Sequence, residues 1–369
     1  MKILVLTSRY TATRDIISED FGRQVRLFSA LAKLGNQVDF LVADYRKFEN
    51  KDIRLHKINV AVRPFSVFSL LSFLRGLNEK LKNRKYDILI GSSDPLWGVF
   101  GYFLAKKNRV KFLYDLHDNY ETYATYKMPF FKYFDRYVVK NSDVVTIISF
   151  ALKSKISKIR KDKVFVIQNG VDTNLFKPMD KLKCRAELKL PKGAKIIAYT
   201  GSIQQRQGVD LLVNVFNKLK REVSNLKLVI AGRFVKGQED KINLNQEGII
   251  HLTLNQEKVA KLINAADVTI VPNRDDEFTR YCFPYKVVEY MACNTPIVAT
   301  KLGDVELMLK GYKDSLCMPD NEEDMYKKIK IQLKKGKINY RKNIKNNTWD
   351  SIARKLDRIL RERLILIIF

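Results

Sequence analysis

The stretch FPYKVVEYMACNTPIVA, residues 283–299, combines a helix start, a polar pair and a buried strand. Pro284 suits the first turn of a helix, where free backbone N–H groups and the helix dipole favour an anion. Lys286 and Glu289 are three residues apart, so both should point to the same side of the helix. A bound diphosphate would explain a lysine in that turn, with Glu289 accepting hydrogen bonds from sugar hydroxyls. An ordinary surface Lys–Glu pair is the alternative that these residues leave open.

Strands and helices alternate along the chain in two successive series. The first series opens with an apolar segment at residues 2–7 and the second with one at residues 196–200; helices are expected after them at residues 22–34 and 209–220. Further buried strands are expected at residues 37–42, 88–91, 112–115, 144–148, 164–168, 228–231, 249–252, 268–271 and 296–299. This alternation is typical of right-handed strand–helix–strand units. The sequence therefore predicts an α/β fold with two Rossmann-like domains.

A segment rich in Gly, Asp and Pro, residues 169–178, separates the two series and is expected to be the linker. In open α/β sheets, ligands bind beyond the carboxyl ends of the strands. With two such sheets in one chain, a cleft between them is the expected site.

The chain is strongly basic, with 68 Lys and Arg against 40 Asp and Glu and a net charge of +28 over 369 residues. Nucleic acid, an anionic membrane surface and anionic substrates each suit such a charge. No nucleic acid partner is expected, since no RNA-binding signature, paired Cys/His finger or helix-turn-helix pattern accompanies it. The four cysteines have no metal-ligand spacing, and Cys293 reads as a small core residue.

Two segments, residues 65–85 and 120–137, place apolar and aromatic side chains beside lysines and arginines. That combination suits peripheral contact with an anionic membrane, and helices that face the core with a solvated end are the alternative. The opening MKILVL reads as a strand rather than a signal peptide. No apolar run, including residues 364–369, approaches the ~20 residues that span a bilayer. We therefore expect a cytoplasmic protein that could lie peripherally at the inner membrane face.

A series of motifs carries a family resemblance. They are YDLHD at residues 114–118, NSDVV at 141–145, QNGVD at 168–172 with FKP at 176–178, GVDLL at 208–212 after Gly201, EYMACNTPIVA at 289–299, and WD at 349–350. In this order and spacing they resemble the family 4, group 1 nucleotide-sugar glycosyltransferases of the GT-B fold. The resemblance covers essentially the whole chain.

The resemblance implies two Rossmann-like domains whose sheets face each other across a cleft. Residues 1–172 would form the acceptor-binding domain, residues 173–345 the nucleotide-sugar-binding domain, and residues 346–369 a helix that returns to the first domain. The reaction implied is transfer of a hexose-type sugar from a nucleoside diphosphate donor to a glycan or lipid-linked acceptor, with retention. Such enzymes usually work without a bound metal or other cofactor, often in the assembly of cell-surface polysaccharide, glycolipid or glycoprotein glycans.

For the donor site, Glu289 matches the second glutamate of the family's Glu-x7-Glu pair, which binds the donor ribose. The first glutamate, which usually contacts the donor sugar, falls on Tyr281. The chain is closer to a subgroup that reads Pro-x-Lys-x-x-Glu-Tyr, in which Lys286 would lie near the phosphates. Phe283, which begins the motif, is also assigned to donor binding, and Arg233 is expected to contact the base.

The remaining site residues come from loops at strand ends. The family's diphosphate-binding Arg/Lys pair falls on Ser202 and Gln207, and Arg206, one place away, could substitute. His117 matches the histidine near the reacting sugar, although a lone histidine after a strand could equally be structural. Gly22 matches the second glycine of a pair that approaches the diphosphate. At the position of the first glycine of that pair, this chain has Phe21, which departs from the family pattern.

Two other functions remain to be weighed. A GT-B sugar-nucleotide epimerase would share the architecture but would need acid and base side chains that the three histidines of this chain hardly supply. A basic binding protein that kept the fold and lost catalysis would account for the departures at Tyr281, Ser202 and Gln207.

Overall fold

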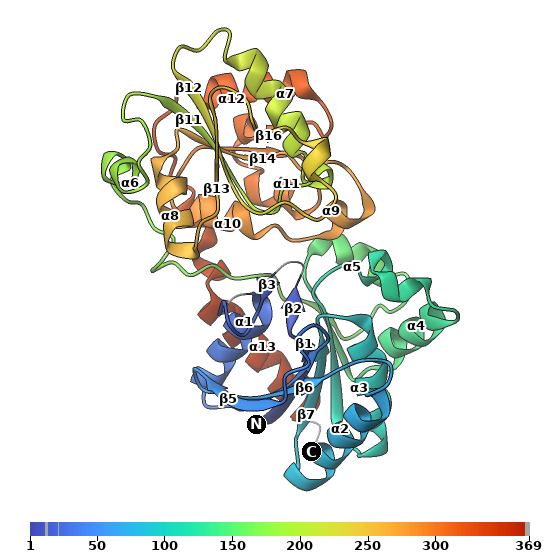
Figure 1. The fold of residues 1–369 in the computed structure, drawn as a ribbon. Helices are drawn as coiled ribbons and strands as arrows, with labels where there is room; N and C mark the ends of the chain where they lie inside the picture. The colour runs from blue at the N-terminus through green and yellow to red at the C-terminus, as the bar shows by residue number, and fades with distance from the viewer. Residues whose placement is uncertain (12–13, 21, 366–369) are drawn as a thin grey trace. The chain divides into compact units, whose positions relative to one another are not determined.

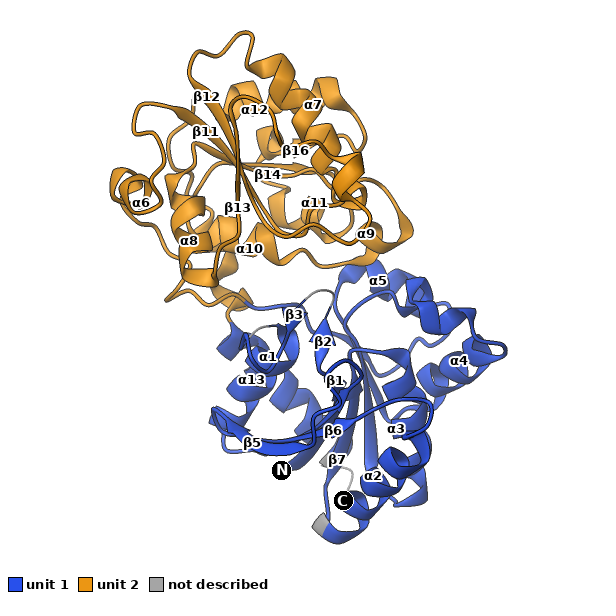
Figure 2. Cartoon of the chain, viewed as in Figure 1, with its two compact units in different colours: residues 1–170, 349–369 blue, residues 171–348 orange. Residues whose placement is uncertain are grey.

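The computed structural model describes residues 1–11, 14–20 and 22–365. Phe21, proposed above to replace a glycine, and most of the apolar run at residues 364–369 lie outside that part. The chain divides into two compact units, shown in different colours in Figure 2. Unit 1 comprises Met1–Gly170 with Trp349–Phe369, and unit 2 comprises Val171–Thr348.

Unit 1 contains an eight-stranded sheet in the order β10-β9-β8-β7-β1-β4-β6-β5. Its strands are β1 (Lys2–Ser8), β4 (Gln37–Asp44), β5 (Lys51–Leu55), β6 (Ile58–Pro64), β7 (Ile88–Ser92), β8 (Lys111–Leu116), β9 (Val144–Ile147) and β10 (Val164–Val166). Neighbouring strands are parallel except at the edge, where β5 pairs antiparallel with β6. A short hairpin, β2 (Tyr10–Thr11) and β3 (Arg14–Asp15), follows β1.

Helices cover both faces of this sheet (Figure 1). On one face, α1 (Arg23–Lys33) and α13 (Trp349–Leu360) share an apolar core with β1, β4 and β7. The other face carries α2 (Leu70–Arg84), α3 (Pro95–Lys107) and α4 (Phe131–Asn141), and α5 (Phe150–Ile156) follows β9. Trp349 therefore begins a C-terminal helix that packs on α1, as the sequence predicts.

Unit 2 contains a six-stranded, wholly parallel sheet in the order β13-β12-β11-β14-β15-β16. Its strands are β11 (Lys195–Thr200), β12 (Leu226–Ala231), β13 (Ile249–Leu252), β14 (Val268–Val271), β15 (Ile297–Thr300) and β16 (Leu316–Cys317). One core joins α7 (Val209–Leu219) and α12 (Glu322–Gln332) to one face, and a second joins α6 (Lys181–Glu187) and α8 (Gln256–Ala265) to the other. The remaining helices are α9 (Glu277–Tyr281), α10 (Tyr285–Ala292) and α11 (Asp304–Leu309).

The α/β fold with two sheets is confirmed. The sequence did not predict β5 and β6, for two local reasons. The two strands are joined by a tight turn at His56, which adopts a left-handed φ of 52° without the Gly or Asn that usually marks such turns. In addition, β5 is largely exposed, so it lacks the apolar pattern of a core strand.

Within the described residues, no helix is long and apolar enough to cross a membrane.

Candidate functional site

The carboxyl edge of the unit 2 sheet has a position where the strand order reverses. Strands β12 and β13 extend from β11 in one direction, and β14, β15 and β16 extend from it in the other. This is the position, beyond the carboxyl ends of the strands, where doubly wound sheets bind ligands. The loop after β11 runs through the short 3₁₀ turn Gln205–Gln207 to the start of α7.

Two glycines let the loops after β11 and β14 approach closely. Gly208 has a φ of 67°, and a Cβ atom there would lie 1.8 Å from the carbonyl oxygen of Pro272, which follows β14. Gly201 has a φ of 139°, and a Cβ atom there would lie 2.9 Å from the Nζ of Lys286. Gly201 thus leaves room for the lysine amine beside the end of β11.

Lys286 reaches the end of β11 from the first turn of α10. Its Nζ donates to the Oε1 of Gln207 at 2.7 Å and to the Oη of Tyr199 at 3.2 Å. The amine also lies 4.4 Å from the centre of the Tyr199 ring. Tyr199 is held in turn, because its hydroxyl donates to the carbonyl oxygen of Ser202 at 2.7 Å.

The arginines of the same edge are paired with carboxylates. Ion pairs join Arg206 to Asp276 at 2.8 Å, Arg274 to Asp210 at 2.6 Å, and Arg280 to Asp275 at 2.8 Å. Lys286 differs from these three arginines, because no carboxylate of the described residues lies within ion-pair distance of its amine.

The surroundings of Lys286 also lower the pKa of its amine. Burial lowers the pKa of Lys286 to about 8, against the opposing attraction of Cys282 and Glu289. The amine therefore still carries its proton at neutral pH, where its charge has a desolvation cost that an anion would offset.

The start of α10 has no side-chain cap, and its body is fixed. Pro284, the N-cap of α10, and Gly208, the N-cap of α7, have no side chain that accepts a hydrogen bond from the first N–H groups of the helix. Such ends favour anions. The Oη of Tyr290 accepts from the backbone N of Thr200 at 3.0 Å, which ties α10 to the end of β11. The C-terminal end is held by Arg341, whose Nη1 donates to the Ala292 carbonyl oxygen at 3.1 Å.

The other predicted donor-site residues differ in burial. Glu289 is half-buried one turn after Lys286, and its carboxylate is close enough to favour the charged lysine. Tyr281 is half-buried at the end of α9. Phe283 is 4% exposed, so it belongs to the core. Arg233 is exposed, and its carbonyl oxygen accepts from Ile203 in the loop after β11.

Arg206 does not meet Lys286. Its guanidinium faces α9, paired with Asp276 and 5.0 Å from the ring of Phe278. Ser202 is linked to Lys286 indirectly, because its carbonyl oxygen accepts the hydrogen bond from the Tyr199 hydroxyl. The expected substitute for the family's Arg/Lys pair is thus engaged elsewhere, whereas Lys286 lies at the strand end.

His117 and Gly22 belong to unit 1, where a buried ion pair connects their segments. Arg23, next to Gly22, binds Asp115, two residues before His117, at 2.9 Å. The Nδ1 of His117 lies 2.8 Å from the Oη of Tyr120. Burial lowers the pKa of His117 to about 4, although the Asp115 charge acts in the opposite direction. His117 is therefore a neutral hydrogen-bonding group at physiological pH.

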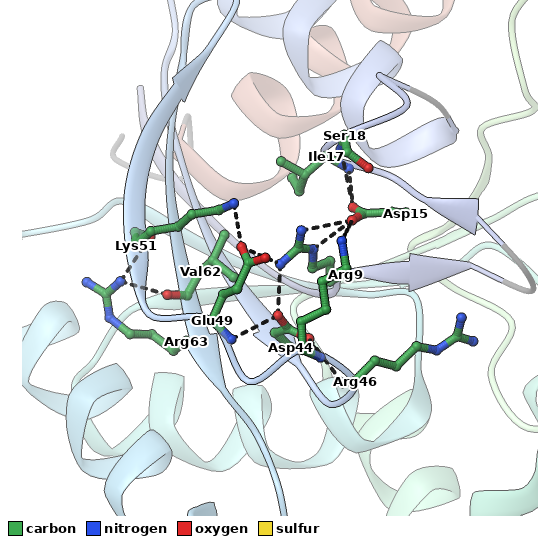
Figure 3. A network of polar contacts seen from close by, with 11 residues as sticks. Arg9, Asp15, Ile17, Ser18, Asp44, Arg46, Glu49, Lys51, Val62 and Arg63 are labelled. Atoms are coloured by element: carbon green, nitrogen blue, oxygen red, sulfur yellow. Dashed lines mark hydrogen bonds and ion pairs between the residues drawn. The ribbon is translucent and has the colours of Figure 1, made fainter.

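A second polar network fixes the loops that follow β1 and β4 in unit 1 (Figure 3). Arg9 is 2% exposed and binds Asp15 and Asp44 at 2.8 Å and Glu49 at 2.9 Å. Glu49 is also paired with Lys51. The network joins the β2–β3 hairpin to the segment after β4, so it shapes the carboxyl edge of the sheet.

Among the residues described, no group of three or more His, Cys, Asp or Glu side chains could hold a metal ion. The expectation of a metal-free reaction remains a prediction.

Sequence reasoning missed Tyr199 and the contact between Gln207 and Lys286. Tyr199 lies in a strand with 0% exposure, so its sequence context indicated only a core residue. Gln207 was noted as a departure from the family pattern, and the structure places its amide oxygen against the lysine. A lysine in a helix first turn was the available signal, since it predicts neighbours that tolerate a positive charge.

Two family models match consecutive parts of the chain. The model for glycosyltransferase family 4 matches residues 24–175, and the model for group 1 glycosyl transferases matches residues 180–351. An uncharacterized glycosyltransferase of Methanocaldococcus jannaschii is 22% identical over 305 residues, which cover 81% of each chain. A D-inositol 3-phosphate glycosyltransferase of Segniliparus rotundus is 30% identical over 155 residues, which cover 38% of this chain and 32% of that relative.

Solved structures share the fold over nearly the whole chain. Sucrose-phosphate synthase of Thermosynechococcus elongatus superposes with a TM-score of 0.78 at 19% identity and covers 98% of both chains. HepE of Anabaena, solved in complex with UDP, superposes with a TM-score of 0.70 at 17% identity over 99% of this chain and 96% of that one. At these identities the likeness establishes the fold, which is GT-B.

Proposed function

Because this chain belongs to the group 1 glycosyltransferases of family 4, enzymes that use nucleotide-sugar donors, we propose that it moves a hexose-type sugar from a nucleoside diphosphate to a glycan or lipid-linked acceptor with retention. The proposal extends to assembly of a cell-surface polysaccharide, glycolipid or glycoprotein glycan.

The observation that carries the donor half of this proposal is the Lys286 amine at the carboxyl edge of β11, charged and without a carboxylate partner among the described residues. A diphosphate placed there would meet the lysine and the uncapped starts of α7 and α10. These groups would stabilise the negative charge that develops on the leaving diphosphate. Glu289, one turn later, would accept hydrogen bonds from the ribose.

The family resemblance supplies the other proposed site residues. Ser202, Tyr281 and Phe283 would contact the sugar and phosphates, and Arg233 would contact the base. In unit 1, His117 would hydrogen-bond the reacting sugar as a neutral imidazole, and Gly22 would let the backbone approach the phosphates. Arg206 needs to leave Asp276 before it can bind a phosphate, so we assign it a smaller share of the charge stabilisation than Lys286.

The experiment that tests the donor assignment is a thermal-shift screen of the whole protein with UDP, GDP and ADP. A ligand at 100 times its Kd stabilises the folded protein by about 2.7 kcal/mol. The UDP-bound structural relatives make UDP the first nucleotide to test. A rise in Tm with at least one nucleotide, abolished in Glu289→Ala, is the expected result. No shift with any of the three would contradict the proposal.

We also propose that unit 1 contacts an anionic membrane that presents the acceptor. Ten of the sixteen large apolar side chains found exposed in the described residues lie between positions 67 and 150. Val67 and Phe68, just before α2, are 88% and 99% exposed, and Tyr133 on α4 is 73% exposed. Lys132 and Arg136 are exposed beside Tyr133. Exposed aromatic groups next to cations are the chemistry of an interfacial contact.

Sedimentation with liposomes tests this contact. Binding to phosphatidylserine-containing vesicles at low salt, loss at high salt, and weaker binding of the double variant Phe68→Ser/Tyr133→Ser are expected. Leu182→Ser, which changes an exposed apolar residue of unit 2, is the matched control. Failure of the unaltered protein to sediment with anionic vesicles would remove the membrane proposal and leave the donor proposal intact.

A further inference from the structure

The Lys286 amine is held by neutral oxygen atoms, although carboxylates are plentiful nearby. Its two hydrogen-bond partners are an amide oxygen, on Gln207, and a phenol oxygen, on Tyr199. At the same edge of the sheet, Asp210, Asp275 and Asp276 are each paired with an arginine. The loops thus keep the acidic groups occupied elsewhere.

Because both partners are neutral, Lys286 keeps its net positive charge and can still bind an anion. A carboxylate at either position would neutralise the ammonium group, and an incoming phosphate would first have to replace it. Neutral acceptors fix the direction of two N–H bonds and leave the net charge unchanged. An ammonium group has three N–H donors, so one remains for a ligand.

Both partners are themselves oriented by the backbone. The Tyr199 hydroxyl donates its proton to the Ser202 carbonyl oxygen, so its lone pairs are turned toward Lys286. Gln207 directly precedes Gly208, which is packed against Pro272 and begins α7. Gly201 provides the space that the amine occupies. Tyr199 of β11 and Gln207 of the following loop therefore fix the position of the lysine amine.

We propose that Gln207 and Tyr199 are positioning residues, which hold the Lys286 ammonium at the end of β11 without neutralising it so that it can bind the donor diphosphate. This inference rests on the proposed function and adds residues that act through Lys286 rather than on the donor directly. It predicts that the charge of the side chain at position 207, more than its size, determines donor affinity.

Gln207→Glu is the decisive variant, because it preserves the shape of the side chain and changes the acceptor into a carboxylate. The probe is UDP, or whichever of UDP, GDP and ADP shifts the Tm of the unaltered protein, and the readout is Kd by calorimetry. We expect affinity to fall roughly tenfold or more, which corresponds to about 1.4 kcal/mol. Gln205→Glu, an exposed neighbour in the same turn, adds the same charge and should leave Kd within about twofold.

Three further variants keep the inference testable if Gln207→Glu folds poorly. Gln207→Met removes the acceptor without adding charge and should weaken binding by roughly threefold. The exchange Lys286→Gln/Gln207→Lys puts an amine and an amide back within the same contact, so it should bind the nucleotide more tightly than Lys286→Gln alone. For Tyr199→Phe, which keeps the ring and removes the hydroxyl, we expect a higher KM for the donor with a smaller change in kcat.

The outcomes separate this inference from the proposed function. If the unaltered protein binds a nucleotide and Gln207→Glu binds it equally well, or no worse than Gln205→Glu, the positioning role is wrong and the donor site stands. If the exchange variant binds no better than Lys286→Gln alone, an ammonium held in this contact does not support donor binding, and the inference is again overturned. If the unaltered protein binds none of the three nucleotides, the proposed function itself fails.

Discussion

Arg23 binds both carboxylate oxygens of Asp115, at 2.9 and 3.1 Å, and both side chains are only 2% exposed. Asp115 also accepts from the hydroxyl groups of Ser92 and Thr146, at 2.9 and 2.7 Å, so its charge is fully engaged. The pair joins the start of α1, which Gly22 precedes, to the end of β8, which His117 follows.

Breaking this pair should destabilise unit 1 strongly. Removal of one partner of a buried ion pair typically costs about 3–5 kcal/mol, because the other charge is left buried. We therefore expect Arg23→Ala to lower the free energy of unfolding by that amount in urea denaturation. Arg26→Ala, which removes a half-exposed partner of Asp20 on the same helix, should cost less than ~1 kcal/mol. Equal losses for the two variants would contradict this reading.

Donor binding should be coupled to protonation of Lys286. Burial depresses its pKa to about 8, below its usual value of 10.5, so in the free protein the amine loses its proton as the pH rises through 8. A bound diphosphate favours the charged form and raises that pKa, so binding at pH 8.5 to 9 should take up protons. Calorimetry in two buffers of different ionisation enthalpy measures the uptake. Identical heats in both buffers, or equal uptake by Lys286→Met, would be inconsistent with a lysine at the diphosphate.

The same pKa has a consequence for stability. Between pH 8 and 10.5 the unfolded chain keeps the Lys286 proton that the folded protein has lost, so this group makes the folded state more stable as the pH rises through that window. In Lys286→Met that contribution should be missing, and its urea midpoint should change less between pH 8 and 10 than that of the unaltered protein. A parallel change in both proteins would show that Lys286 titrates normally.

Gly208 should be intolerant of any side chain. Its left-handed φ of 67° costs an alanine about 1–2 kcal/mol, and the Cβ atom would also collide with the Pro272 carbonyl oxygen. We expect Gly208→Ala to lose more stability than that and to bind nucleotide poorly, as measured by urea denaturation and calorimetry. Gly237→Ala is a matched control, because its φ is 80° and nothing lies within 4 Å of the new Cβ. A loss no larger than the control's would mean that the two loops are not in close contact.

The Arg9 network should contribute to stability above pH 4 and release in acid. Burial alone would raise the pKa of Asp44, but hydrogen bonds from the backbone N–H groups of Lys47, Arg46 and Glu49 outweigh it and lower the pKa to about 2. Asp44 therefore stabilises the fold above its unfolded pKa of 3.8, and this contribution is lost as the pH falls toward 2. Asp44→Asn should be less stable at pH 6 and should lose less stability between pH 4 and 2. Parallel acid profiles would exclude this role.

The fold followed from the sequence because core strands in parallel sheets are continuous apolar runs, as at β1 and β11. The hairpin at His56 could not be recognised, since its turn lacks the Gly or Asn that usually marks a two-residue hairpin loop.

In the site, Lys286 could be singled out from local sequence alone, because a lysine opposes the dipole of its own helix start. Its partners could not, because Tyr199 and Gln207 lie 87 and 79 residues away and reach it only through the sheet order β11–β14. Likewise, the ion pair of Arg206 could not be predicted, because its partner Asp276 lies far away in the sequence, at the start of α9.

The most direct test of the central claim is turnover. The release of nucleoside diphosphate from UDP-, GDP- and ADP-sugars should be measured for the unaltered protein and for Lys286→Met, with folding of each checked by circular dichroism. We predict that the unaltered protein turns over at least one donor and that Lys286→Met is slower by roughly 100-fold or more, as when a group that stabilises transition-state charge is removed. Turnover of Lys286→Met close to that of the unaltered protein would contradict the assignment of Lys286 to the diphosphate.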